Sequence, residues 1–427
     1  MTQFGRTFRL VCDDKDIPLV ESLLVAQGFS FEPEPFYSGA RKLTHEPFPL
    51  GESLASRFGL IYIQDRSSML PPLTLDPPEG ASVLDMCSAP GSKTSLLSRL
   101  VGPHGFVFAS EPSADRLGTL RANLRRTGSV NAVTAKAMAQ DLPFPEQSWE
   151  YIQLDPPCSG WGTADKNPKV MDVWSGSKTA PLIALQKTLL EKAAGLLKPG
   201  GVVLYSTCTT NIEENEEQVA WALEALDLEL EPLAEPEGFV FGAPLMDGMD
   251  GVLRVSEDSA GQGFFLARFR KKMSVSAIDG HRVQKRELPG NRLRLTRMIG
   301  GEHIYMKNLP AGEVFDFGGK AFFLPEQALE MIPGSIRWQG FPLGKVAGKG
   351  DRLKFLPGGL ARILLPPTPD QAQFDVLDVD DIRILEQLFT GQSVRFASGK
   401  GPVGLYYRGL PLGWLSRKGS RLLWAIK

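Results

Sequence analysis

The sequence lacks the residue patterns that mark metal sites, membrane spans and disulfide scaffolds. Its four cysteines, at 12, 87, 158 and 208, are widely spaced with no C-x-x-C pair, and its four histidines form no ligand pair. A structural metal site is therefore not expected. No apolar run approaches the length of a membrane span, and MTQFGRTFRLVCDDKD is too polar for a signal peptide. We expect a cytoplasmic protein with reduced thiols, no metal and no membrane partner.

An excess of charge of one sign is also missing. The 47 basic and 49 acidic side chains give a net charge of −2, so the total does not indicate a nucleic-acid partner. The chain has 427 residues, of which 42% are hydrophobic, and this is ample for two to four domains with real cores. A disordered or fibrous protein is excluded.

The middle of the chain alternates apolar strands with amphipathic helices. Strands are expected at 82–87, 105–110, 130–134, 151–154 and 201–206, and helices at 93–101, 114–127 and 181–197. This alternation predicts an α/β fold with a doubly wound, mostly parallel, Rossmann-like sheet. The later stretch GQGFFLARFRK predicts a final strand that pairs antiparallel at an edge of this sheet.

The flanking regions predict smaller units. Residues 1–53 combine a strand at 7–12 with a helix at 18–27, which indicates a small α/β appendage before a central domain at 54–272. We expect this appendage to bind RNA. Short apolar runs separated by Gly and Pro follow, and they predict two β-rich modules at 273–372 and 373–427.

The stretch ASVLDMCSAPGSKTSLLSRL predicts a strand, a tight loop and a helix. Its small residues Ser88, Ala89, Gly91 and Ser92 let the backbone approach a ligand closely, and the first N–H groups of the helix favour an electron-rich partner. A nucleotide-like cofactor binds at this place in open parallel sheets. The loop is neither G-x-G-x-x-G nor a P-loop, so a dinucleotide or a triphosphate is disfavoured.

Polar residues end three further strands. Glu111 ends the second strand, where an acid commonly holds ribose hydroxyls, although it also fits a favourable charge at the start of the next helix, ahead of Ser113. The fourth strand ends in Asp155-Pro-Pro-Cys158, whose prolines fix a stiff loop. The fifth ends in Ser-Thr-Cys208-Thr. Two cysteines and a carboxylate are therefore expected at one crevice.

This set of groups suits one kind of chemistry. A thiolate can add to an electron-poor ring carbon when its surroundings lower its pKa, while a carboxyl group at the ring edge draws charge away. Addition at carbon 6 of a cytosine makes carbon 5 able to take a methyl group from a sulfonium, and a second thiol could assist release. The alternative is that each cysteine is an inert, buried small hydrophobe. Their joint occurrence in D-P-P-C and S-T-C favours chemistry.

At these residues the sequence resembles a known family. DMCSAPGSKT, LDPPCSG and YSTCT, in that order, are similar to the cofactor loop and the two cysteine motifs of the Sun-type RNA 5-methylcytosine methyltransferases, which use S-adenosylmethionine. YIQDRSSMLP, GTADKNPKVMDVWS and NIEENEEQV add support. The C-terminal stretch PVGLYYRGLPLGWLSRKGSRL most resembles the RsmF branch, which modifies small-subunit ribosomal RNA and ends in a PUA-like RNA-binding module.

The resemblance implies roles by motif position. Cys208 would be the nucleophile, and Cys158 would promote release of the methylated base. Asp155 would hold the cytosine edge, with Lys93 close to both cofactor and base. The residues implied to bind S-adenosylmethionine are Cys87, Ser88, Ala89, Pro90, Gly91, Ser92, Lys93, Glu111 and Asp155, with Arg116 placed behind the acid.

One position departs from the family pattern. An aspartate after the third strand usually bonds the adenine, and here KAMAQDLPF places Met138 there. Asp141 could substitute after a register shift, although it more naturally starts the next loop. This departure concerns the affinity for the cofactor.

Two features indicate contact with RNA. Residues 268–297 hold ten basic and two acidic side chains, an excess that suits phosphates, although a solvated linker is the alternative. Near the C-terminus, Tyr406, Tyr407 and Trp414 could stack on bases, or could form core. Basic residues lie beside them in the sequence: Arg408, Arg417, Lys418 and Arg421.

Together these features predict a monomeric enzyme that flips a cytosine out of structured RNA and methylates its carbon 5. The expected partner is small-subunit ribosomal RNA or the subunit itself. Methylation of transfer RNA stays open, because the catalytic motifs do not separate the two substrates. A non-catalytic RNA-binding ribosome-assembly factor with a degraded cofactor pocket at Met138 is the alternative from another class.

Overall fold

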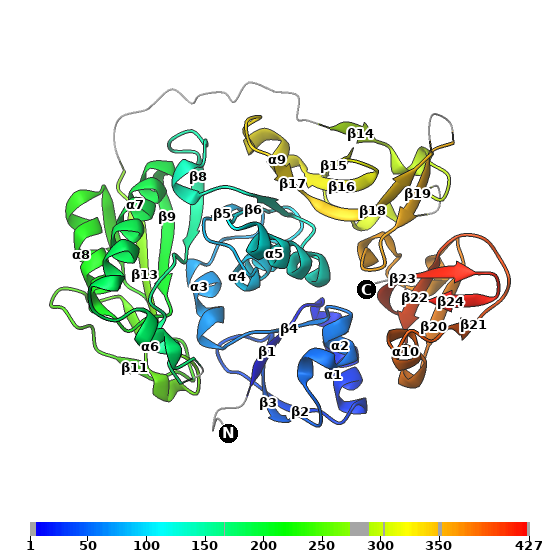
Figure 1. The fold of residues 1–427 in the computed structure, drawn as a ribbon, viewed down its shortest axis with the longest axis horizontal. Coiled ribbons are helices and arrows are strands. Elements are labelled where there is room, and N and C mark those ends of the chain that lie inside the picture. The colour runs from blue at the N-terminus through cyan, green and yellow to red at the C-terminus, as the bar shows by residue number, and fades with distance from the viewer. Residues whose placement is uncertain (1–5, 166, 274–289, 302–303, 349–351, 425–427) are drawn as a thin grey trace.

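The computed structural model describes residues 6–165, 167–273, 290–301, 304–348 and 352–424. These residues form a four-stranded sheet, a ten-stranded sheet and two five-stranded sheets (Figure 1). Within the described ranges, every helix is too short or too polar to cross a bilayer.

The N-terminal unit is an antiparallel sheet in the order β2-β3-β1-β4. Its strands are β1 (Thr7–Leu10), β2 (Ser30–Pro33), β3 (Ala40–His45) and β4 (Ile61–Ile63). Helices α1 (Ile17–Ala26) and α2 (Leu54–Arg57) contact each other beside it. The predicted strand and helix are present, and β4 lies beyond residue 53, where we expected the appendage to end.

The central sheet has five parallel strands at its middle, in the order β7-β6-β5-β8-β9. They are β5 (Ser82–Asp85), β6 (Phe106–Ser110), β7 (Ala132–Ala135), β8 (Trp149–Leu154) and β9 (Leu197–Thr207). Because β5 lies in the middle and the chain winds outward on both sides, the predicted doubly wound α/β fold is confirmed.

Helices cover both faces of this sheet because side chains alternate along each strand. Val83 packs into the core under α3 (Leu70–Leu75), α4 (Ser92–Leu100) and α5 (Ala114–Thr127). Its neighbour Leu84 packs into the opposite core, under α7 (Ala180–Leu196) and α8 (Glu216–Ala225). The short helix α6 (Lys169–Val173) precedes α7.

The predicted final strand is present as β13 (Phe264–Lys271), antiparallel to β9. The expectation that it lies at an edge is wrong. Further strands pair with its other side: β10 (Leu228–Glu231) and β12 (Leu253–Val255), with β11 (Phe241–Gly242) beyond β12. Strands of two to four residues are too short to show an alternating pattern in the sequence.

The C-terminal region is β-rich, as predicted. One sheet contains β14 (Asn291–Leu293), β15 (Gly312–Asp316), β16 (Lys320–Pro325), β18 (Phe341–Ala347) and β19 (Lys354–Pro357). The other contains β20 (Val376–Val379), β21 (Val394–Arg395), β22 (Val403–Tyr407), β23 (Leu410–Lys418) and β24 (Arg421–Leu423). The helices are α9 (Glu326–Met331) and α10 (Ile382–Phe389). Strand β17 (Trp338–Gln339) pairs with β7, so this region extends the central sheet.

The C-terminal aromatics are core rather than surface. Tyr406, Tyr407 and Trp414 are at most 3% exposed. The Tyr406 hydroxyl donates to the Pro366 carbonyl at 3.0 Å, and Trp414 Nε1 donates to the Ala361 carbonyl at 3.0 Å. The idea that these rings stack on bases is therefore wrong.

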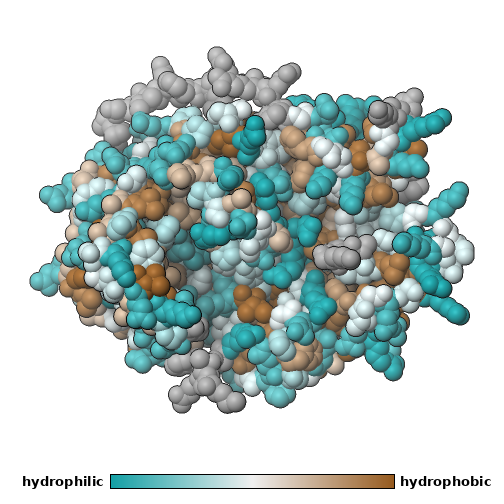
Figure 2. All heavy atoms as spheres, viewed as in Figure 1, coloured by the Kyte–Doolittle hydropathy of each residue, from teal (hydrophilic) through white to brown (hydrophobic). Residues whose placement is uncertain are grey.

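Of the basic segment 268–297, residues 274–289 lie outside the described residues. On the face shown in Figure 2, hydrophobic side chains are scattered among hydrophilic ones.

Trp149 is the largest fully buried side chain and anchors the central core, with its ring 5.0 Å from Phe144 and 6.0 Å from Phe106. We expect Trp149→Ala to lower the free energy of unfolding by about 3–5 kcal/mol, because it leaves a cavity. Urea denaturation followed by circular dichroism measures this loss. Val25→Ala, at a site 60% exposed, is the control and should change stability by less than about 0.5 kcal/mol. Equal stabilities of the two variants would contradict this packing.

Candidate active site

The two predicted cysteine motifs meet at the carboxyl edge of the central sheet. Strands β8 and β9 are parallel neighbours, and Leu154 pairs with Tyr205 at their ends. Cys158 lies four residues after the end of β8 and Cys208 directly follows β9, and their Sγ atoms lie 3.3 Å apart. Both are free thiols and are partly buried. The structure therefore brings the two sulfurs into one site.

Glycines make this approach of the two loops sterically feasible. The Gly162 N–H donates to the Cys208 carbonyl at 3.1 Å, and a Cβ on Gly162 would lie only 2.4 Å from the Gly263 carbonyl oxygen. Gly160 has φ of 70°, a conformation that other residues rarely adopt, and a Cβ there would lie 3.9 Å from Cys208 Sγ. A side chain at position 162 would therefore clash with the Gly263 carbonyl group, whereas Gly160 is required by its backbone conformation.

A salt bridge lies beside the sulfurs. Lys93 Nζ donates to Asp155 Oδ2 at 2.8 Å, and Ser206 Oγ donates to Asp155 Oδ1 at 2.7 Å. The Phe264 ring centre is 5.5 Å from Lys93 Nζ. Burial lowers the pKa of Lys93, but the neighbouring Asp155 outweighs burial and raises that pKa above its ordinary value. Lys93 is therefore a fixed cation that orients the Asp155 carboxylate.

The two thiols differ in proton affinity. The hydrogen bond from Cys158 lowers the pKa of Cys208; burial and Asp155 oppose this change, and Lys93 assists it. The same hydrogen bond and burial raise the pKa of Cys158 well above its ordinary value. The proton thus stays on Cys158, and Cys208 is the thiol that more readily becomes a thiolate.

The predicted cofactor loop follows β5, and side chains of α5 donate hydrogen bonds to its backbone carbonyls. Gly91 has φ of 101° and precedes the first turn of α4. Arg116 Nη2 donates to the Ala89 carbonyl at 3.0 Å, and Asn123 Nδ2 donates to the Pro90 carbonyl at 2.8 Å. Helix α5 therefore holds the carbonyl groups of the loop.

At the base of the loop, the Asp85 carboxyl group is 1% exposed, and burial raises its pKa to about 6. Thr94 Oγ1 donates to it at 2.6 Å. Burial also raises the pKa of Cys87, which makes this thiol a poor nucleophile. Ser88 and Ser92 flank the bend of the same loop.

Glu111 directly follows β6, and its carboxylate lies at the start of α5, as the helix-charge interpretation predicts. Its Oε1 accepts the Ser113 N–H at 2.8 Å, and its Oε2 is 3.3 Å from Arg116 Nη1. The side chain is 2% exposed. Met138 and Asp141 are both exposed and lie at the two ends of the short turn that follows β7.

Four residues of this edge were not predicted as site residues. Ser206 and Asp85 lie inside motifs that were recognised, so their position was a usable signal. Phe264 comes from β13, far along the chain, and only the fold places its ring beside Lys93. Glu214 is one of several acids in NIEENEEQV, and its complete burial has no signature in the sequence.

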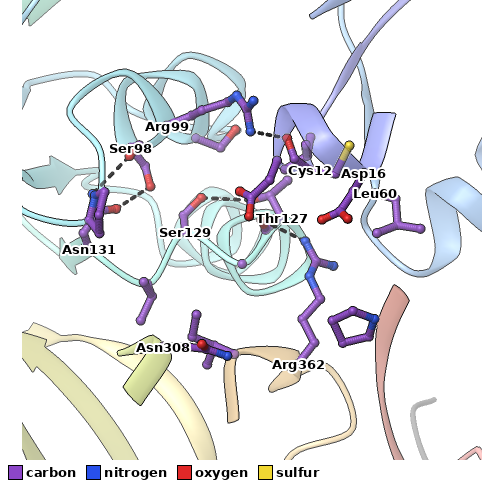
Figure 3. A pocket seen from close by; sticks show the side chains of 18 of the residues that line it. Cys12, Asp16, Leu60, Ser98, Arg99, Thr127, Ser129, Asn131, Asn308 and Arg362 are labelled. Atoms are coloured by element: carbon purple, nitrogen blue, oxygen red, sulfur yellow. Dashed lines mark hydrogen bonds between the residues drawn. The ribbon is translucent and has the colours of Figure 1, made fainter. Parts of the chain in front are cut away.

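A cavity of about 740 Å³ lies at another place, where several units meet (Figure 3). Cys12 of the N-terminal unit and Arg362 of the C-terminal region are among its lining residues. Arg362 reaches toward Thr127, and Arg99 points toward Cys12. None of the predicted site residues lines this cavity, so it is not the candidate active site.

The pKa difference between the two thiols predicts a difference in alkylation. The rate at which Cys208 reacts with iodoacetamide should be half-maximal at a pH below 9.0, the ordinary pKa of a cysteine thiol. Cys158→Ala removes the hydrogen-bond donor while burial and Asp155 remain, so this pH midpoint should rise. Mass spectrometry of the Cys208 peptide measures the rate across about pH 6 to pH 10.

Cys12 is the internal control, because burial raises the pKa of its thiol to about 11. Its peptide should stay largely unmodified at pH values where Cys208 reacts. An unchanged Cys208 midpoint in Cys158→Ala would show that the contact between the sulfurs does not set the pKa.

With this geometry in place, comparisons with known proteins identify the family. A family profile described as "16S rRNA methyltransferase RsmB/F" matches residues 72–270. "Ribosomal RNA small subunit methyltransferase F" of Klebsiella pneumoniae (strain 342) is 30% identical over 94% of this chain and 85% of its own. The protein of the same name from Vibrio atlanticus (strain LGP32) is 31% identical over 94% and 87%. A solved methyltransferase homolog protein from Pyrococcus horikoshii is 34% identical with a TM-score of 0.53, covering 63% of this chain and 87% of that one. The resemblance seen in the motifs is confirmed, and the chain belongs to the RsmB/F family of 16S rRNA methyltransferases.

Proposed function

We propose that this protein transfers the methyl group of S-adenosylmethionine to carbon 5 of a cytosine in small-subunit ribosomal RNA. It acts in the cytoplasm as a monomer, with Cys208 as nucleophile. The observation that carries the proposal is the 3.3 Å contact between the Cys158 and Cys208 sulfurs beside the salt bridge of Lys93 and Asp155. Two thiols of different pKa next to an oriented carboxylate suit covalent activation of a pyrimidine ring.

The strand-end residues fit S-adenosylmethionine. The loop from Cys87 to Lys93 turns sharply at Gly91 and leads into the first turn of α4, which offers backbone N–H groups. Glu111 accepts one hydrogen bond and forms one ion pair. Because a carboxylate has about four lone-pair sites, it can also accept hydrogen bonds from ribose hydroxyls. When bound, the cofactor supplies an electrophilic methyl group on a sulfonium.

In the first half of the reaction, Cys208 forms a bond to carbon 6 of the flipped cytosine. Asp155, fixed by Lys93 and Ser206, accepts hydrogen bonds from the edge of the ring as electron density moves into it. This support is strongest after addition, when the ring edge has gained the proton that the Cys208 thiol gave up. The residues thus stabilise the adduct more than the free base.

In the second half, the proton of the methylated carbon 5 passes to solvent and its bonding pair forms the double bond between carbons 5 and 6. The electron pair of the bond between Cys208 and carbon 6 returns to the sulfur. The S–H of Cys158 donates to the departing Cys208 sulfur, and the same hydrogen bond that lowers the pKa of Cys208 makes its thiolate a better leaving group. The proposal therefore assigns formation of the adduct to Cys208 and assistance of release to Cys158.

Ribosomal RNA is favoured over transfer RNA because the relatives that match most of the chain are named for small-subunit ribosomal RNA. Within the basic segment 268–297, Arg268 and Arg270 both lie at a hydrogen-bonding distance from Glu231. Part of the positive charge of the segment is therefore neutralised within the protein. Bisulfite sequencing of both RNAs, from cells with and without this protein, separates the substrates. One protected cytosine in small-subunit RNA supports the proposal, whereas protection in transfer RNA only contradicts it.

The cysteine roles predict opposite effects of two substitutions. Cys158→Ala should trap RNA covalently on the protein in the presence of S-adenosylmethionine, because the adduct forms but is released slowly. Cys208→Ala should abolish both trapping and methyl transfer. A shifted, RNase-sensitive band on a denaturing gel measures the adduct. The absence of a trapped species in Cys158→Ala, with wild-type folding retained, would contradict these roles.

The cofactor assignment predicts an effect on affinity. Glu111→Ala should weaken binding of S-adenosylmethionine by about tenfold or more, because hydrogen bonds to a charged group are lost. Isothermal titration calorimetry measures the dissociation constant, and Glu224→Ala on the exposed surface of α8 is the control. A wild-type protein that does not bind S-adenosylmethionine would favour a non-catalytic assembly factor.

A further inference from the structure

Glu214 is a fully buried carboxylate between the two cysteine loops. It is 0% exposed and ends the short turn from Ile212 to Glu214, directly after the Cys208 motif. Its Oε2 accepts from the Ser159 N–H and from Gln186 Nε2, both at 2.9 Å, and its Oε1 accepts from Asn211 Nδ2 at 3.1 Å. These donors come from three separate segments of the chain, so one carboxylate joins them.

The first of these segments carries Cys158. Ser159 is the residue directly after Cys158, so the hydrogen bond from its N–H fixes the backbone next to that thiol. Gln186 Nε2 also donates to the Pro157 carbonyl at 2.9 Å, on the other side of Cys158. The peptide groups on both sides of Cys158 are therefore held by Glu214 and Gln186.

The second segment carries Cys208. The Tyr205 hydroxyl at the end of β9 donates to the Glu214 carbonyl at 2.7 Å. The hydroxyls of Ser159 and Thr209 lie 2.7 Å apart, which adds a direct contact between the two loops. Glu214 is thus tied to the Cys208 side through its backbone and to the Cys158 side through its carboxylate.

The Cys208 loop has other ties that do not involve the Glu214 carboxylate. The Cys208 carbonyl accepts a hydrogen bond from the Gly162 N–H at 3.1 Å, and Asn215 Nδ2 donates to the Thr209 carbonyl at 2.9 Å. Thr207 Oγ1 donates to Asn215 Oδ1 at 2.6 Å. A weakened carboxylate at 214 should therefore displace Cys158 more than Cys208.

The chemistry of the site explains why an acid occupies this position. The three donors to Glu214 are a backbone amide and two carboxamides, so both carboxylate oxygens serve only as acceptors. A glutamine has nearly the same shape but turns an NH₂ group toward at least one donor. Hydrogen bonds to a charged acceptor are also stronger than those to a neutral one.

We propose that Glu214 is a positioning residue that holds Cys158 against Cys208 and thereby controls release of the methylated RNA. The inference rests on the proposed function, because it needs Cys158 to act in release. It assigns Glu214 no contact with base or cofactor. Loss of its charge should slow release while leaving formation of the adduct and methyl transfer in place.

The test compares release with methyl transfer in Glu214→Gln. Small-subunit RNA from cells lacking this protein is the substrate, with S-adenosylmethionine labelled in its methyl group. We expect single-turnover methyl transfer to change by less than about threefold, steady-state turnover to fall by about 10- to 100-fold, and covalent complex to accumulate. A merely structural role would lower methyl transfer, adduct and turnover together.

Glu213→Gln is the matched control, because it removes the same charge from the adjacent, exposed residue. Its methyl transfer, turnover and amount of covalent complex should match those of the wild type. Gln186→Met is the second variant, used if Glu214→Gln does not fold, and it should also accumulate adduct because it removes the hydrogen bond to the Pro157 carbonyl and one of the three donors to Glu214. Parallel loss of adduct and turnover, or wild-type kinetics, in the folded variant overturns the inference.

Cys158→Ala in the same assay separates this inference from the proposed function. If Cys158→Ala traps RNA and the Glu214 and Gln186 variants do not, only the role of Glu214 fails. If Cys158→Ala does not trap RNA, the proposed cysteine roles fail first.

Discussion

The parallel pairing of β8 with β9 is the constraint on which the candidate site depends. Because the two strands run side by side and end at the same edge, the loops that follow them start from neighbouring points. Two sulfurs that are 50 residues apart in the sequence thereby come within 3.3 Å. Their hydrogen bond raises the pKa of Cys158 and lowers the pKa of Cys208, so Cys208 is the more readily ionised thiol. Lys93, in the first turn of α4, and Asp155, directly after β8, then complete a site that can activate a pyrimidine.

Much of this arrangement could be predicted because the local signals were strong. Helix α5 begins and ends where its Ser113 cap and Gly128 place it, and the strand ends follow from apolar runs that stop at polar motifs. Adjacent strand ends then imply adjacent cysteines. The distance between the sulfurs, their unequal proton affinity and the burial of Glu214 could not be predicted, since they depend on loop packing between distant segments.

The predictions that failed concern burial and short strands. Tyr406 and Trp414 satisfy their polar atoms with buried carbonyls, and a sequence does not distinguish such rings from exposed ones. Three arginines that join separate units were not predicted either; Arg9 and Arg66 are buried, and Arg362 is half-buried. Arg9 donates to Gln64 and to the Ser92 carbonyl, Arg66 binds Glu34 at 2.6 Å, and Arg362 donates to the Phe58 carbonyl at 2.7 Å. These contacts dock the flanking units onto the domain that carries the site.

The most direct test of the central claim is the identity of the cysteine that bonds to the base. Incubation of the wild-type protein with S-adenosylmethionine and small-subunit RNA containing 5-fluorocytidine should give a stable adduct, because the fluorine at carbon 5 cannot leave as a proton does. Tandem mass spectrometry of the digested complex identifies the modified peptide. A nucleotide on Cys208 is the predicted result, and a nucleotide on Cys158 would contradict the account.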